Sequence, residues 1–245
     1  MQHMEAFIGI LFLFLFFAGV AFIGNATKSN QYTFWPLRYD SRLDEITTRE
    51  RGTQSEHKLI SALLDYGISP KAIFHDLYIK NSRYGYSQSD VAVATRVGII
   101  VFEVKDYSGW IFGRGHQNQW VQVLNYGKDK FRFYNPIMQN ESHIKVLKRQ
   151  SEQLNDIPIY SVIVFYGDCQ LRDISFVPKG TFVTKAYRVD DVLDTIFENN
   201  DAEYTDKQEI IDILQTAVDN GDNKETHTKH VENIKDMLGT DRVFE

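Results

Sequence analysis

A carboxylate and an ammonium group lie two residues apart in an otherwise aliphatic stretch of this chain. Residues 98–105 read Gly-Ile-Ile-Val-Phe-Glu-Val-Lys, with Glu103 and Lys105 at the end. Because side chains alternate along a strand, both groups leave the same face as Ile99 and Val101. Ionised groups among aliphatic neighbours are costly unless they are paired or bound to a metal. The stretch therefore indicates either a structural ion pair at a strand end or, more sharply, a metal site.

A second carboxylate, Asp90, is expected beside Glu103. Residues 89–95 have the composition of a strand, and only two residues separate them from the stretch 98–105. An antiparallel hairpin that is symmetric about this link places Asp90 opposite Glu103, whereas a one-residue bulge would break that register. Directly opposed like charges destabilise a sheet. A divalent cation between them would turn repulsion into coordination, and oxygen ligands of this kind suit Mg²⁺.

Two further residues, Lys105 and Glu56, have side chains suited to metal-assisted phosphodiester hydrolysis. Lys105 could stabilise an attacking water or the charge that develops on a phosphate. Glu56 lies on the apolar stripe of an expected helix that begins near Ser55, as its cap, and ends near Tyr66. From that inward face Glu56 could hold a water in the site. The alternative for Glu56 is a first-turn acid that favours the helix dipole.

The rest of the pattern predicts an α/β or α+β core, with a mixed sheet flanked by helices. Its elements are short apolar runs separated by turn residues, followed by amphipathic helical segments. The expected strands are 72–79, 89–95, 98–105, short ones near Trp110, Trp120 and Phe131, 159–166 and 181–184, and the expected helices are 54–66, 137–154, 190–199, 206–219 and 226–238.

A hydrophobic leader precedes this core. Residues 6–24 carry no charge over 19 positions, which is near the length that crosses a bilayer as a helix. The first five residues lack Lys and Arg, whereas Lys28 and Arg38 follow the span, so the positive-inside rule places the C-terminal domain in the cytoplasm. The rival interpretation is a signal peptide cleaved near residues 24–26, which would make the protein secreted.

Charge and cysteine content narrow the classes of protein further. The net charge is -6, with 27 Lys and Arg against 33 Asp and Glu. Residues 27–150 hold 18 basic and 12 acidic residues, whereas residues 151–245 hold 9 and 20. The basic segment could attract polyanions and the acidic one would repel them. One cysteine, Cys169, excludes an intrachain disulfide framework and a cysteine-cluster metal site.

The order of these motifs resembles the nuclease-related domain (NERD) family of the PD-(D/E)xK superfamily. The resemblance covers about residues 51–155, and Trp120 falls where the family tends to place a tryptophan. In place of the family's usual residues stand Ser55 before the helix glutamate and Val-Ala-Val-Ala after Asp90. The matching stretches are Gly52-Thr-Gln-Ser-Glu56, Phe74-His-Asp-Leu77, Gln88-Ser-Asp90, Gly98 to Gly109, and Asn135-Pro-Ile-Met-Gln-Asn140 with His143.

The resemblance implies a restriction-endonuclease-like core, a requirement for Mg²⁺ (or Mn²⁺) and a nucleic-acid substrate, DNA or RNA. It also implies roles for residues that match the motifs. Asp90 and Glu103 would bind the metal, Lys105 would be the catalytic lysine and Glu56 the accessory acid, and Gln88, Gln139 and His143 would support the site or touch nucleic acid.

The sequence thus predicts four segments. They are a transmembrane anchor at 1–27, a linker at 28–50, a nuclease-like domain at 51–166 and a C-terminal strand with an acidic helical extension at 167–245. The function expected is that of a membrane-anchored, Mg²⁺-dependent nuclease. The alternative is a module that binds nucleic acid, or acts as a scaffold, at the membrane without catalysis.

Overall fold

The computed structural model of the chain describes residues 40–82 and 85–222. The expected membrane span at residues 6–24 and the expected helix at 226–238 lie outside these ranges. Among the helices that the structure does describe, none combines the length and the apolar character needed to span a bilayer.

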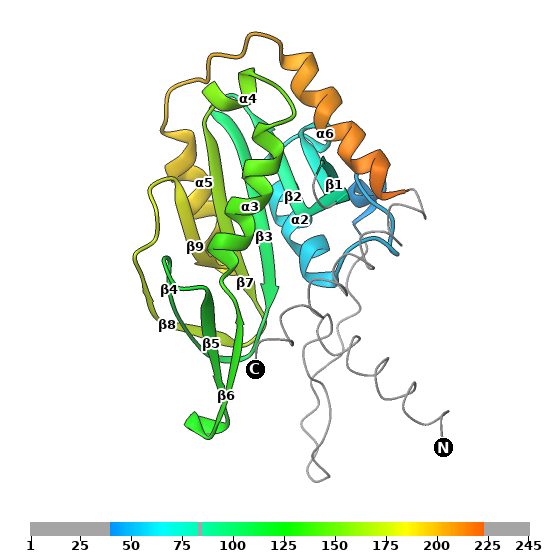
Figure 1. The fold of residues 1–245 in the computed structure, drawn as a ribbon. Coiled ribbons are helices and arrows are strands. Elements are labelled where there is room, and N and C mark those ends of the chain that lie inside the picture. Colours follow the sequence, from blue (N-terminus) through cyan, green and yellow to red (C-terminus); the bar gives the residue numbers. More distant parts are fainter. Residues whose placement is uncertain (1–39, 83–84, 223–245) are drawn as a thin grey trace, which may run out of the picture. The chain divides into compact units, whose positions relative to one another are not determined.

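A five-stranded mixed sheet forms the centre of the fold (Figure 1). Its first three strands pair antiparallel, whereas the third, fourth and fifth run parallel to one another. The mixed α/β core predicted from the sequence is confirmed. In spatial order the strands are β1 (Ile73–Asn81), β2 (Gly85–Thr95), β3 (Gly98–Asp106), β7 (Ile159–Tyr166) and β9 (Thr181–Lys185).

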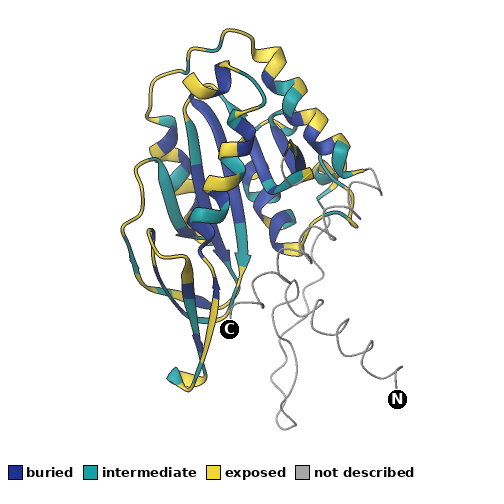
Figure 2. Ribbon diagram, viewed as in Figure 1, coloured by how far each residue is buried: buried dark blue, intermediate teal, exposed yellow. Residues whose placement is uncertain are grey.

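Helices cover both faces of this sheet, which is why its central strands are buried almost throughout (Figure 2). On one face pack α2 (Gln54–Tyr66) and α5 (Val189–Phe197), which bury Leu and Ile side chains against β2, β3 and β7. On the other face pack α3 (Pro136–Lys148), α4 (Gln153–Asp156) and α6 (Lys207–Gly221). Short 3-10 turns occupy 41–45, 70–72, 125–127 and 186–188.

A second, four-stranded sheet lies beyond the C-terminal ends of β3 and β7 (Figure 1). Trp120 fills its inner side and stacks on Phe165 of β7, with ring planes 4° apart. Gly113 lies directly against the Trp120 ring, at a position where a Cβ atom would collide with it. Its strands, in spatial order, are β6 (Asp129–Tyr134), β5 (Gln119–Leu124), β4 (Gly109–Arg114) and β8 (Cys169–Ser175).

Three local expectations differ from the structure. The cap of α2 is Thr53, whose hydroxyl accepts from the Glu56 N–H, and Ser55 instead donates a hydrogen bond to Asp106. Instead of one helix at 137–154 there are two, α3 and α4, with a turn at residues 149–150 between them. The polar strand β8 had no counterpart among the expected elements.

Candidate active site

The hairpin of β2 and β3 brings Asp90 and Glu103 together at one end of the sheet. The two strands pair from Thr95 with Gly98 up to Val91 with Phe102, which is the predicted register. At the next position the backbone ladder stops, and the Asp90 carboxylate accepts the Val104 N–H at 2.7 Å. By strand alternation Glu103 and Lys105 leave β3 on the side covered by α3, where Lys105 meets Gln139.

The two carboxylates are crowded and only partly neutralised. Burial, the charge of Glu103 and the charge of Glu56 together hold the pKa of Asp90 well above its usual value. Glu103 is 1% exposed, and its Oε1 accepts from the Lys105 ammonium at 2.6 Å. Its Oε2 is buried and has no hydrogen-bond partner among the described residues. An unpartnered buried carboxylate oxygen is costly, so this atom is suited to a cation that is not part of the chain.

Lys105 is held as an ammonium group between two side chains. Its Nζ donates to Glu103 and, at 3.1 Å, to Oε1 of Gln139 on α3. Burial lowers the pKa of Lys105, but the negative charges of Glu103 and Asp90 outweigh it, so the net shift is upward. Lys105 therefore keeps its positive charge at neutral pH and can face an anionic group.

Helix α3 positions the supporting residues because its start is fixed by Asn135. The Asn135 side chain caps the helix at the Ile137 N–H and donates to three carbonyls in the turn between β4 and β5. One helical turn beyond Gln139 lies His143. Its Nδ1 is 2.7 Å from the Ser87 hydroxyl and its Nε2 is 3.6 Å from Oε2 of Glu103.

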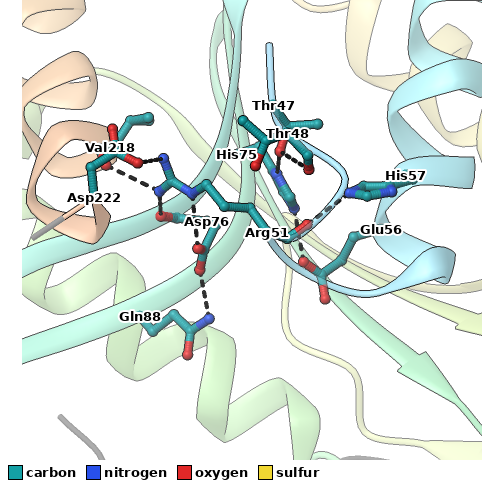
Figure 3. Close-up of polar contacts among 10 residues, drawn as sticks. All are labelled: Thr47, Thr48, Arg51, Glu56, His57, His75, Asp76, Gln88, Val218 and Asp222. Atoms are coloured by element: carbon teal, nitrogen blue, oxygen red, sulfur yellow. Dashed lines mark hydrogen bonds and ion pairs between the residues drawn. The ribbon is translucent and has the colours of Figure 1, made fainter. Parts of the chain in front are cut away.

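Glu56 reaches the site from the opposite face of the sheet, where α2 packs. One of its oxygens accepts from the Thr53 hydroxyl at 2.7 Å. The other accepts from Nε2 of His75 at 2.9 Å, and Nδ1 of His75 is 2.6 Å from the Thr47 hydroxyl (Figure 3). Burial raises the pKa of Glu56, but the contacts with His75 and Thr53 lower it by more. Glu56 thus stays ionised and acts on Asp90 through its charge rather than through a hydrogen bond.

Gln88 belongs to a neighbouring network rather than to the carboxylate cluster. Its amide donates to Oδ1 of Asp76 at 2.7 Å, and Oδ2 of Asp76 accepts from Arg51 at 3.2 Å (Figure 3). His75 and Asp76 lie in the matched stretch from Phe74 to Leu77, but no role was predicted for either of them. The signal was present, because both are polar residues in the apolar strand Ile73–Asn81.

The donor set fits a hard divalent cation. Across residues 40–82 and 85–222, no group of three or more His, Cys, Asp or Glu side chains is arranged to hold a metal. The two carboxylates, Asp90 and Glu103, nevertheless supply oxygen donors with an excess of negative charge. Mg²⁺ is commonly bound by one or two carboxylates, with water and substrate phosphates as the other ligands.

Comparison of the sequence with known proteins identifies a family for the middle of the chain. The family model of the nuclease-related domain matches residues 51–166. A Bacillus anthracis protein, described as uncharacterized, is 30% identical over 120 residues, which are 48% of this chain and 54% of that protein. The chain thus spans about half the length of this curated relative. No solved structure matches the chain. Residues 51–166 are therefore a nuclease-related domain, of the restriction-endonuclease-like superfamily.

Proposed function

We propose that this domain hydrolyses phosphodiester bonds of DNA or RNA, with Mg²⁺ held by Asp90 and Glu103. The observation that carries the proposal is the buried Oε2 of Glu103, which has no hydrogen-bond partner among the described residues and lies in a cluster where the pKa of Asp90 is raised. The ion pair with Lys105 uses Oε1, and Oε2 lies 3.6 Å from Nε2 of His143, which is too far for a hydrogen bond. A cation bound there would satisfy the oxygen and relieve the repulsion.

The side chains of the cluster have distinct parts in this function. When bound, Mg²⁺ supplies Lewis-acid activation of water and neutralises charge on the phosphate. Lys105 stays protonated and faces the developing negative charge, while Gln139 fixes the direction of its ammonium group. Glu56, kept ionised by His75 and Thr53, adds negative potential that attracts the cation.

The proposal is tested by cleavage assays with the full-length chain in non-ionic detergent. Labelled single-stranded and duplex DNA and RNA are incubated with Mg²⁺, Mn²⁺ or EDTA, using wild type, Glu103→Gln and Lys105→Ala. Both substitutions are expected to reduce cleavage at least 100-fold, because Glu103→Gln removes a charged ligand of the metal and Lys105→Ala removes the cation that faces the phosphate. Glu141→Gln is the matched control, since Glu141 is an exposed carboxylate on α3 that pairs with Lys145.

Two results would count against the enzyme. Equal cleavage by wild type and both variants would show that the activity comes from elsewhere. Retained binding of nucleic acid without cleavage in either metal would favour the non-catalytic module.

We also propose that residues 6–24 anchor the chain in the cell membrane with the nuclease-related domain in the cytoplasm. The support is the uncharged run of 19 residues followed by basic positions. Mass spectrometry of the mature protein is expected to find the intact N-terminus in the membrane fraction. A mature chain that begins near residue 26 would instead show a cleaved signal peptide and a secreted protein.

A further inference from the structure

The small sheet has a buried face and an uncovered face of different chemistry. The buried face carries Trp120. Cross-strand partners share a face, so the pairs Trp110 with Val123 and Phe112 with Val121 belong to the other one. The pairing of Val121 with Arg132 extends this face to the edge strand β6. We call it the outer face of the small sheet; Trp110, Phe112 and Val121 are half-buried on it, and Val123 is buried.

Positive charges on this outer face are not neutralised by carboxylates. Arg114 and Lys130 lie on it by alternation, beside Arg132, and all three are exposed. The Arg172 guanidinium lies 5.2 Å from the centre of the Trp110 ring. No ion pair joins any of these four cations to an acid within the part of the chain that the structure describes. Asp173, which pairs with Phe112, is the acid that the register places on this face.

A groove runs along the edge strand β8, and Arg172 belongs both to its lining and to the outer face. It lies between β8 and β9, has a volume of about 400 Å³ and has no Asp or Glu in its lining. Basic and aromatic side chains line it, namely Arg172, Lys185, Tyr187 and Arg188. Tyr187 is 81% exposed. Lys185 donates to the Gly167 carbonyl, which holds its ammonium group at the groove, whereas the charge of Arg188 is balanced by the exposed Asp191.

The chain connects this sheet directly to the carboxylate cluster. Strand β4 begins four residues after Lys105, and β6 runs through Asn135 into α3, which carries Gln139. The Tyr107 ring, two residues after Lys105, packs against Phe133 of β6, with the ring centres 4.7 Å apart. The small sheet is therefore joined directly along the chain to β3 and α3, which carry Glu103, Lys105 and Gln139.

We propose that the outer face of the small sheet and its groove bind single-stranded nucleic acid. Cations along a strip attract the phosphate backbone, and Trp110, Phe112 and Tyr187 offer rings on which unpaired bases can stack. The Arg172 guanidinium adds a further stacking plane beside Trp110. A duplex hides its base faces and would gain only the charge attraction. This inference rests on the proposed function for the choice of nucleic acid as partner, but it does not require catalysis.

The test is fluorescence anisotropy of a labelled single-stranded 20-mer with the full-length chain in EDTA, so that cleavage does not interfere. Lys130→Glu is expected to weaken binding at least 10-fold and to reduce the slope of log affinity against log salt by about 0.7, the value for one phosphate contact on a single strand. Lys71→Glu is the matched control, because Lys71 is exposed at the start of β1, near the opposite end of the sheet. It should bind like wild type.

Stacking is tested separately from charge. Trp110→Leu keeps an apolar side chain but removes the ring, and a loss of about five-fold or more in affinity for the single strand is expected, with little loss for a duplex of equal length. Circular dichroism and the melting temperature show whether each variant is folded. Lys130→Glu, which changes an exposed side chain, keeps the test decisive if Trp110→Leu does not fold.

Three outcomes would overturn the inference. In the first, Lys130→Glu and Lys71→Glu weaken binding equally. In the second, wild type binds duplex as tightly as single strands, and Lys130→Glu and Trp110→Leu each lose as much affinity for duplex as for single strands. The third is binding to anionic lipid vesicles, in place of nucleic acid, that is lost in Lys130→Glu. If wild type and Lys105→Ala both bind the single strand but wild type does not cleave it, the proposed hydrolysis is refuted. The proposed binding surface is then still supported.

Discussion

Arg51 should be worth far more to the stability of the protein than an ordinary surface arginine. Its side chain is 16% exposed, and the guanidinium bonds to the Asp76 carboxylate and the Asp76 carbonyl in β1 (Figure 3). It also donates to the Val218 carbonyl near the end of α6 and to Asp222. Arg51 therefore ties the entry to the nuclease-related domain to a helix that lies outside it.

The magnitude of the loss follows from which of these bonds are buried. The Asp76 side chain is 6% exposed, and Arg51→Ala would leave its charge with Gln88 as its remaining side-chain donor. Breaking a buried pair by removing one partner costs about 3–5 kcal/mol. The Asp222 side chain is 66% exposed, so Asp222→Asn should cost less than about 1 kcal/mol. Arg51→Lys should recover little, because an ammonium group cannot reproduce the planar fork.

The assay is equilibrium unfolding in urea together with thermal melting. A loss of about 3–5 kcal/mol corresponds to a fall in melting temperature of about 6–20 °C for a domain of this size. Hydrogen exchange should report early opening at the C-terminal end of α6. Arg51→Ala and Asp76→Asn should also be combined. The double variant should lose at least about 1 kcal/mol less in free energy of unfolding than the sum of the losses in the two single variants. The reasoning is refuted if Arg51→Ala costs no more than Asp222→Asn.

Two further predictions concern single contacts. Glu56→Gln should lower the free energy of unfolding by about 1.5–3 kcal/mol at neutral pH. Because the folded-state pKa of Glu56 lies below 4.5, this loss of stability should be complete above about pH 4.5 and should shrink as the pH falls through the folded-state pKa. A deficit that does not depend on pH between 2 and 7 would rule out an ionised Glu56. Gly113→Ala should cost at least about 1–3 kcal/mol in urea unfolding, because the new methyl group meets the Trp120 ring. The double variant of Gly113→Ala and Trp120→Phe should lose less stability than the sum of the losses in the two single variants. Strictly additive losses would contradict the contact between Gly113 and Trp120.

The hairpin at the centre of the site was predictable because its register depends on local features. A two-residue link and two apolar runs fix which residues face each other, and the structure has the expected pairs from Thr95 to Val91. The end of the hairpin was not predictable from the same rules. There the backbone pairing gives way to the bond between the Val104 N–H and the Asp90 side chain, a contact that strand periodicity does not encode.

Capping and polar partners were harder to predict than strands. Thr53 and Ser55 are both suitable caps, and the choice depends on Asp106, which is distant in sequence and takes the Ser55 hydroxyl. Gln88 was expected to support the carboxylate cluster, but Asp76 occupies its amide. Both outcomes depend on contacts between segments, which local patterns do not carry.

Strand β8 was missed because it lacks the usual signature of a strand. Its residues, Cys-Gln-Leu-Arg-Asp-Ile-Ser, alternate poorly, and Cys169 is the one that is fully buried. It is held by parallel pairing to β4, with a shift of register after Ile111. Pairing at the edge of a small sheet leaves little trace in hydrophobic periodicity.

The central claim is that Asp90 and Glu103 form a site for a divalent cation, and Mn²⁺ binding measured by electron paramagnetic resonance tests it most directly. Asp90→Asn keeps an acceptor for the Val104 N–H, and Glu103→Gln keeps one for Lys105, so both variants should remain folded. Wild type and Glu141→Gln are expected to bind Mn²⁺, and the two site variants to lose at least ten-fold in affinity. Unchanged Mn²⁺ affinity in both site variants, or no Mn²⁺ binding by wild type, would contradict the claim.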